Sequence, residues 1–301
     1  MYDIIVLGAG FAGMTAALYG ARAGKKVLIV EKNTFGGQIT FSPKVENYPA
    51  VVQASGNELA ENLIEQVIAA GAEVEPAEIK SLNLEGKVKK VITDGAEYEA
   101  LSVIIALGAG HRPLGLPGEE ELIGSGISYC AVCDGAFFKG KKVAVVGGGN
   151  TALQDALYLS AYCSEVYLIH RRDAYRAEKE LVSRLADKPC IKQVLNATVK
   201  SLLANDGVLT GIEVNVKNSD DFKIALDGVF VAIGVVPETA ITEGIDKDEN
   251  GYIKAGEDCR TNIEGVFAAG DCRTKTVRQL VTAVADGAVS ALAACEYTDR
   301  I

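Results

Sequence analysis

The chain has 301 residues, 49% of them hydrophobic and 23% charged, with a net charge of −10. This composition excludes intrinsic disorder, and the length is about twice the ~150 residues of an average domain, which predicts two domains. The acidic balance disfavours nucleic acid as a partner. We find no apolar run of the ~18 residues that a membrane helix needs, so we expect no membrane partner.

The cysteines indicate a reducing compartment. There are seven, an odd number, and five are scattered singly, unlike the disulfide framework of a secreted protein. The N-terminus lacks a basic segment and enters a strand at once, so no signal peptide is visible. We therefore expect a cytoplasmic protein.

Two stretches of the chain, 139 residues apart, share one plan of strand, glycine turn, helix and second strand. This order predicts two βαβ units. The first has a strand over 4–7, a turn over 8–13, a helix to about 23 and a strand over 27–30 that ends at Glu31; the second has the same parts over 143–146, 147–152, to about 162 and over 166–169, ending at His170.

Each unit continues with hairpin-like segments and a buried strand, and Pro-rich or Gly-rich links follow near Arg112 and Pro237. The tail has a strand over 265–269 and a helical pattern over about 279–297, too little for a third domain. We expect it to pack on the first unit. The predicted domains are 1–112 and 242–301, forming one discontinuous domain, and 113–241, inserted between them.

The first glycine turn has the context of a dinucleotide site. Gly8, Gly10 and Gly13 follow a strand and open a helix, and Glu31 lies 18 residues after Gly13. In this pattern the glycines permit a tight turn, a close approach of pyrophosphate to the backbone, and close packing of helix on strand. The acid accepts hydrogen bonds from ribose hydroxyls, and the helix N-terminus faces the phosphates.

The second turn carries Gly147, Gly149 and Ala152, but no acid follows its second strand. Arginines bind a 2′-phosphate with forked hydrogen bonds, whereas an acid would repel it. The second site is therefore predicted to prefer NADPH, and the chain to be an α/β protein with two Rossmann-like dinucleotide-binding domains. The basic residues in place of the acid are His170, Arg171, Arg172 and Arg176.

Cys130 and Cys133 form a Cys-x-x-Cys pair followed by Asp134. Zinc would need further ligands at suitable spacing, and the only histidines are His111 and His170, so no metal is expected. The spacing suits a disulfide that opens and closes. Two dinucleotide sites and one disulfide suggest transfer of electrons from a nicotinamide to a flavin and then to the disulfide.

These residues resemble the low-molecular-weight thioredoxin reductase family along essentially the whole chain, with its pyridine nucleotide-disulfide oxidoreductase architecture. No single motif carries the resemblance. The matching segments are 8–13, 36–38, 45–49, 130–135, 147–152, 170–172 with Arg176, 265–271 and 278–279.

The resemblance implies a homodimer that reduces thioredoxin with NADPH, with FAD in the first site. It implies that Cys130 attacks the thioredoxin disulfide, that Cys133 faces the flavin, and that Asp134 is the general acid for the departing thiolate. Beyond the residues already named, the implied cofactor contacts are Phe11, Ala12, Gly37, Gln38, Asn47, Gly270, Asp271, Arg278, Gln279 and Leu280 for FAD, and Asn150 and Thr151 for NADPH.

Three other enzymes share such a scaffold: a flavin-dependent dithiol oxidase, a ferredoxin-dependent reductase and a peroxiredoxin-coupled disulfide reductase. The oxidase and the ferredoxin enzyme would not need Arg171, Arg172 and Arg176, so the sequence disfavours both. A non-catalytic FAD-binding protein would not need the cysteine pair. Reduction of the flavin by NADPH separates that last class from the enzymes.

Overall fold

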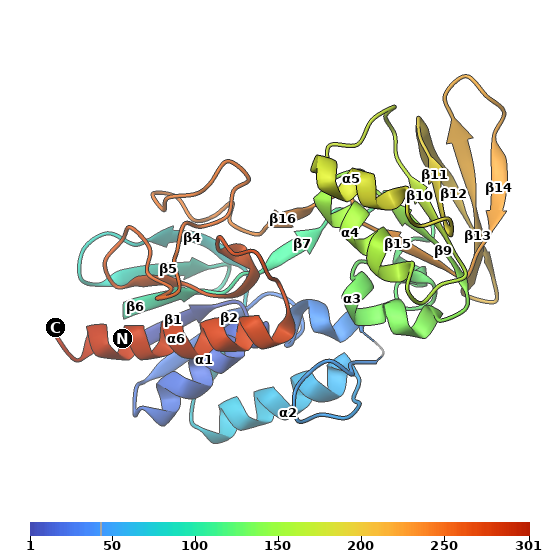
Figure 1. Ribbon diagram of the computed structural model, residues 1–301. Coiled ribbons are helices and arrows are strands. Elements are labelled where there is room, and N and C mark those ends of the chain that lie inside the picture. Colours follow the sequence, from blue (N-terminus) through green and yellow to red (C-terminus); the bar gives the residue numbers. More distant parts are fainter. Residues whose placement is uncertain (43) are drawn as a thin grey trace. The chain divides into compact units, whose positions relative to one another are not determined.

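A computed structural model describes residues 1–42 and 44–301 and divides the chain into two units (Figure 1). Unit 1 comprises Met1–Gly110 and Val236–Ile301, and unit 2 comprises His111–Val235. Each unit contains a mainly parallel sheet with helices. The predicted α/β class, with one discontinuous unit interrupted by another, is confirmed.

Unit 1 is built on a seven-stranded sheet of order β3-β2-β1-β6-β5-β4, with β17 paired to β6. The pairs β1–β2, β1–β6, β2–β3 and β6–β17 are parallel, and β4–β5 and β5–β6 are antiparallel. The bounds are β1 Tyr2–Leu7, β2 Val27–Glu31, β3 Glu73–Pro76, β4 Ile79–Asn83, β5 Lys89–Thr93, β6 Glu97–Ile105, β17 Val266–Ala268, α1 Phe11–Arg22, α2 Gly56–Ala69 and α6 Leu280–Thr298.

Successive side chains of β1 point to opposite faces of the sheet, so the core of unit 1 lies on both faces. Ile4 and Val6 join one buried cluster with residues of α1 and α6, whereas Ile5 and Leu7 join another with residues 245–272. Both faces are covered, as a parallel sheet requires. Within the described residues, α6 alone is long and apolar enough by length and composition to cross a membrane, a test that core helices of soluble proteins also pass.

Unit 2 repeats the plan with a five-stranded parallel sheet of order β11-β10-β9-β15-β8, beside a three-stranded antiparallel sheet of order β12-β13-β14. The turn between β9 and α4 corresponds to the turn between β1 and α1. The bounds are β8 Ile127–Ser128, α3 Ala131–Asp134, β9 Lys142–Val146, α4 Asn150–Leu159, β10 Glu165–Ile169, α5 Lys179–Leu185, β11 Ile191–Val194, β12 Ala197–Asn205, β13 Val208–Val216, β14 Phe222–Ala225 and β15 Gly228–Val231; short 3-10 turns are η1 Gly37–Phe41, η2 Glu120–Leu122, η3 Gly135–Phe138 and η4 Gly270–Cys272.

The chain passes between the units twice, through β7 (Ala109–His111) and β16 (Val235–Pro237), which pair as a two-stranded sheet. The division into units thus falls after Gly110 and Val235, near the sequence-based boundaries of 112 and 241.

Candidate active site

The first glycine turn lies between β1 and α1, and two of its three glycines are required by the fold. A β-carbon on Gly8 would lie 2.6 Å from the carbonyl oxygen of Ala106, and Gly8 has a φ of +97°. A β-carbon on Gly13 would lie 1.9 Å from the carbonyl oxygen of Gly8. At Gly10 it would meet nothing within 4 Å. The backbone at Gly10 therefore stays open to a ligand, at the start of a helix without a side-chain cap among the described residues.

Glu31 ties the end of β2 to this turn. Its Oε2 accepts the N–H of Ala9 at 2.8 Å, and its Oε1 accepts the N–H of Asn33 at 2.8 Å. The N–H of Gly36 donates to the carbonyl of Ala9, and a β-carbon on Gly37 would lie 3.3 Å from the Cα of Gly10. These contacts bring together the glycine turn, the Glu31 carboxylate and the segment of Gly37 and Gln38, as a dinucleotide site requires.

A second group of predicted residues in unit 1 includes one that lies against the first glycine turn. Gly270 and Asp271 form η4 after β17, and a β-carbon on Gly270 would lie 2.8 Å from the Cβ of Ala12. The amide of Asn47 lies 3.5 Å from the Oε1 of Gln279, the residue before α6. Arg278 stacks over the ring of Tyr252 at 4.0 Å and reaches the carbonyl of Asp271 at 3.4 Å.

Asp271 carries an acceptor without a partner. Its Oδ1 is buried and has no hydrogen-bond donor among the residues described. Burial raises the pKa of Asp271, while Lys275 and Arg278 lower it. A buried carboxylate oxygen with no donor is costly unless a ligand supplies one. Hydroxyl groups, such as those of a sugar or ribityl chain, have the chemistry to satisfy it.

A buried ionic network, which no sequence motif indicated, supports the η4 turn that holds Gly270 and Asp271. Asp286 of α6 is 6% exposed and receives Arg273 through both oxygens, at 2.8 and 2.7 Å. Its Oδ2 also accepts Lys275 at 2.9 Å and the N–H of Gly270 at 2.9 Å. Burial pushes the pKa of Asp286 upward, but these hydrogen bonds and charges hold it below its ordinary value. The network anchors Gly270, the neighbour of Asp271, to α6.

The second glycine turn, in unit 2, repeats the logic of the first. A β-carbon on Gly147 would lie 2.3 Å from the carbonyl oxygen of Ala232, whereas at Gly149 it would meet nothing within 4 Å. At Gly148 it would lie 2.1 Å from Nδ1 of His170. Gly149 precedes α4, whose first residues are Asn150 and Thr151. Gly149 is thus the open position of the second turn, as Gly10 is of the first.

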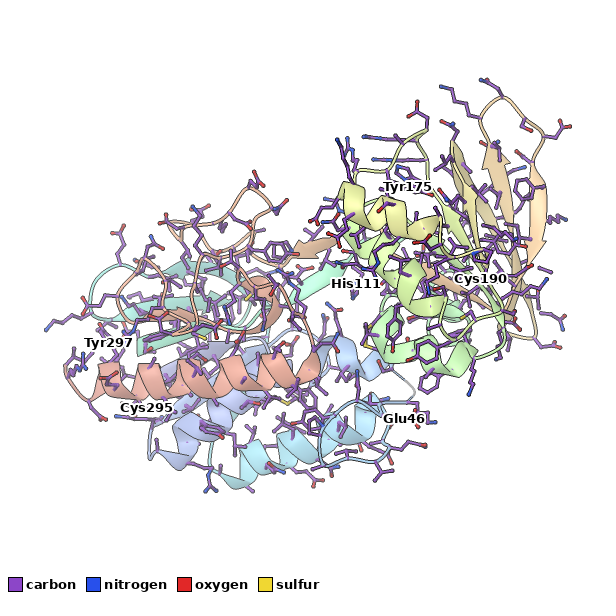
Figure 2. All side chains as sticks on the ribbon, in the orientation of Figure 1. Glu46, His111, Tyr175, Cys190, Cys295 and Tyr297 are labelled. Atoms are coloured by element: carbon purple, nitrogen blue, oxygen red, sulfur yellow. A yellow bond between two sulfur atoms is a disulfide. The ribbon has the colours of Figure 1, made fainter. Side chains whose placement is uncertain are left out.

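Three hydrogen bonds join the arginine segment that follows β10 to this turn. The N–H of Arg176 donates to the carbonyl of Gly148 at 2.7 Å. Asn150 and Glu178 exchange two hydrogen bonds, at 2.8 and 2.9 Å. The His170 ring, 7% exposed, stacks on Tyr175 (labelled in Figure 2), with its Nε2 3.1 Å from the carbonyl of Ala174.

His170 therefore faces the protein and shapes the segment, while the arginines face outward. Arg171 and Arg176 are exposed and Arg172 is half-buried. No ion pair joins any of these three guanidiniums to a carboxylate within residues 1–42 and 44–301. Three available guanidiniums beside an open glycine turn suit a phosphate group.

Cys130 and Cys133 form a disulfide at the short helix α3, with Cα atoms 5.3 Å apart. The N–H of Cys133 donates to the Sγ of Cys130 at 3.2 Å. Asp134 follows directly, and its Oδ2 accepts the hydroxyl of Ser128 at 2.6 Å. Burial raises the pKa of Asp134, and the Ser128 hydrogen bond counteracts it. A half-buried disulfide beside such a carboxyl is equipped for thiol chemistry with proton transfer.

The remaining five cysteines are free thiols: Cys163, Cys190, Cys259, Cys272 and Cys295 (Cys190 and Cys295 are labelled in Figure 2). All are buried except Cys190, which is half-buried, and burial raises the pKa of the Cys163 thiol to about 11. Inert core thiols have these properties.

Comparison with known proteins gives one consistent result. Residues 2–287 match the family model described as pyridine nucleotide-disulphide oxidoreductase. The chain is 42% identical over 301 residues to a thioredoxin reductase of Treponema pallidum, covering 100% of this chain and 98% of that one, and 41% identical over 304 residues to one of Bacillus subtilis, covering 100% and 96%.

Among solved structures, the chain is similar to a thioredoxin reductase from Streptococcus pyogenes, with a TM-score of 0.95 and 40% identity, covering 100% of this chain and 99% of that one. A thioredoxin reductase from Lactococcus lactis matches at 38% identity and a TM-score of 0.70, with full coverage of both chains. The chain therefore belongs to the pyridine nucleotide-disulphide oxidoreductase family.

Proposed function

We propose that this protein is an NADPH-dependent thioredoxin-disulfide reductase with FAD as its resident cofactor. The observation that carries the proposal is the Cys130–Cys133 disulfide next to the buried carboxyl of Asp134, in the same unit as a glycine turn flanked by available arginines. The names of the full-length relatives support the same function.

We assign the first site, in unit 1, to FAD. The open backbone at Gly10 and the unpaired acceptor of Asp271 fit a dinucleotide with a hydroxylated chain. When bound, FAD supplies a two-electron carrier between a nicotinamide and a disulfide, which no side chain provides. The residues that would hold it are Gly8, Gly10, Phe11, Ala12, Gly13, Glu31, Gly37, Gln38, Asn47, Gly270, Asp271, Arg278, Gln279 and Leu280.

We assign the second site, in unit 2, to NADPH. Gly147, Gly149, Asn150 and Thr151 would receive the pyrophosphate, and Arg171, Arg172 and Arg176 the 2′-phosphate. His170 would act indirectly, because its ring packs inward against Gly148 and Tyr175. The exposed guanidiniums would then discriminate NADPH from NADH by charge-assisted hydrogen bonds.

In the thiol step, the reduced pair transfers two electrons to thioredoxin, which takes up one proton from Asp134 and one from solvent. The Cys130 thiolate attacks one sulfur of the thioredoxin disulfide, forming a mixed disulfide, and the other thioredoxin sulfur leaves as a thiolate. Asp134 gives that thiolate a proton. The Cys133 thiolate then attacks the Cys130 sulfur, which restores the Cys130–Cys133 disulfide and releases thioredoxin with its second thiol, protonated from solvent.

The N–H of Cys133 is already directed at the Sγ of Cys130. Such a donor stabilises a thiolate more than a thiol, which supports Cys130 as the attacking sulfur.

The test is turnover of NADPH with oxidised thioredoxin, followed by NADPH absorbance and by counting thioredoxin thiols. We expect two thiols for each NADPH consumed. A dithiol oxidase would instead make hydrogen peroxide from dithiols without NADPH, a ferredoxin-dependent enzyme would work only with reduced ferredoxin, and a peroxiredoxin-coupled enzyme would turn over with peroxiredoxin and not with thioredoxin. Any of these three results would overturn the proposal.

We further propose a homodimer in a reducing, cytoplasmic setting. The five free thiols suit a compartment that keeps cysteines reduced. Sedimentation of the FAD-loaded protein tests the dimer, with a monomer at micromolar concentration contradicting it.

A further inference from the structure

Ser128 is a buried hydroxyl that connects two parts of the redox site. It is the last residue of β8 and is 5% exposed. Its Oγ accepts the N–H of Cys130 at 3.1 Å and lies 2.6 Å from the Oδ2 of Asp134. The carbonyl oxygen of Cys130 is farther from Oγ, at 3.4 Å.

The hydroxyl has one proton to donate, and the geometry indicates where it goes. An ionised carboxylate is an acceptor only, so at 2.6 Å the hydroxyl must donate to Asp134. The other carboxylate oxygen, Oδ1, is buried and has no partner among the described residues. Among the described residues, Ser128 is thus the side chain that forms a hydrogen bond with the Asp134 carboxyl.

The charged residues on the elements packed against α3 do not replace Ser128 as the partner of the Asp134 carboxyl. Helix α3 packs against η3, which holds no titratable residue, and against α4, which carries Asp155 and Tyr158. Burial raises the pKa of Asp155 to about 7, and burial and the Ser128 hydroxyl are the influences that act on the pKa of Asp134. No ion pair to Asp134 occurs in the described ranges.

We infer that Ser128 is a positioning residue for the thiol step: its hydroxyl fixes the proton-donating carboxyl of Asp134 and the backbone of Cys130 in one arrangement. The inference rests on the proposed function and deepens it. In the proposed step Asp134 gives its proton to the departing thioredoxin sulfur, whereas Ser128 acts through its hydrogen bonds with Asp134 and Cys130.

The inference predicts the direction of a pH effect. Without the hydroxyl, burial alone acts on Asp134, so its pKa rises further. Activity that needs protonated Asp134 falls as the pH rises through that pKa. This fall is the alkaline limb of the pH–activity profile. In Ser128→Ala the limb therefore moves to higher pH, by roughly one to two pH units for the loss of a hydrogen bond to a charged group. At the optimum, kcat falls because the carboxyl is no longer held in place.

The experiment uses the FAD-loaded enzyme as wild type, Ser128→Ala, Ser128→Thr, Asp134→Asn and the Ser128→Ala/Asp134→Asn double variant. We would measure kcat and KM for thioredoxin across pH, and separately the rate of flavin reduction by NADPH, which precedes the thiol step. We expect Ser128→Ala to lower kcat about tenfold with KM within twofold, to shift the limb upward and to leave flavin reduction unchanged. Ser128→Thr keeps the hydroxyl and should keep the wild-type limb.

Asp134→Asn should lack the limb, and adding Ser128→Ala to it should change kcat less than twofold. Ser128→Gly removes the same hydroxyl and replaces the alanine variant if that protein is unstable. The role of Ser128 would be overturned if the alkaline limb of Ser128→Ala were unshifted. It would also be overturned if Ser128→Ala lowered kcat in the Asp134→Asn background as much as it does in the wild-type protein. Wild-type protein that oxidises NADPH without reducing thioredoxin would instead overturn the proposed function.

Discussion

Substitution of Gly149 separates the contribution of this residue to ligand binding from its contribution to folding. An alanine β-carbon would meet nothing within 4 Å, and the backbone, with φ −96° and ψ −179°, suits any L-residue. Alanine reduces the entropy of the unfolded chain by about 0.4–1 kcal/mol but is a poorer N-cap than glycine by a similar amount. We therefore expect the free energy of unfolding to change by less than about 0.5 kcal/mol.

The affinity for NADPH, in contrast, should fall strongly. The methyl group would occupy the space in which a pyrophosphate approaches the backbone. Loss of one hydrogen bond to a charged phosphate corresponds to about 1.5–3 kcal/mol, or roughly a 10- to 150-fold rise in the Kd for NADPH. Urea unfolding and NADPH titration of Gly149→Ala measure the two quantities on the same protein.

Gly147→Ala is the matched control. Its β-carbon would lie 2.3 Å from the carbonyl oxygen of Ala232 and 2.7 Å from the Cβ of Ala152. Such overpacking should lower the free energy of unfolding by about 1–3 kcal/mol. The reasoning is refuted if Gly149→Ala binds NADPH as wild type does, or if both variants lose the same stability.

Three further predictions follow from the sites. In Cys130→Ser, NADPH should still reduce the flavin while thioredoxin reduction stops; wild-type thioredoxin turnover would contradict the role of Cys130. Arg176→Ala should raise KM for NADPH about 10- to 150-fold and leave KM for NADH within twofold, so equal losses with both nucleotides would refute a phosphate contact. Asp286→Ala leaves Arg273 and Lys275 buried without their carboxylate and should lower the free energy of unfolding by about 3–5 kcal/mol in denaturant titrations. Because the folded-state pKa of Asp286 is lowered, its stabilisation is fully present above the ordinary pKa of about 3.9 and is lost as pH falls from there through the folded-state pKa; a stability difference between wild type and Asp286→Ala that persists unchanged in acid would contradict this.

Local patterns made both glycine turns predictable. Each places its glycines between a strand and a helix, and the strand–turn–helix order follows from neighbouring residues alone. No prediction covers helix α2, although Ser55 and Glu58 form a capping box at its start, a signal that the sequence displays.

The supporting contacts could not be predicted, because they join residues that no local pattern relates. Asp286 interrupts an apolar helix in the sequence, and only the fold shows that it receives Arg273 and Lys275. Ser128 precedes the cysteine pair without any distinguishing motif, and its contact with Asp134 depends on how β8 meets α3. His170 is adjacent to the arginines in the sequence, which predicts a shared role, whereas its ring packs on Gly148.

An anaerobic titration of the purified FAD-loaded protein with NADPH, followed by flavin absorbance, tests the central claim most directly. The flavin and the Cys130–Cys133 disulfide each accept two electrons, so full bleaching should require about two equivalents of NADPH. A Cys130→Ser/Cys133→Ser variant should require about one. No bleaching of the wild-type protein, or full bleaching at about one equivalent with the disulfide still intact, would contradict the claim that NADPH reduces this disulfide.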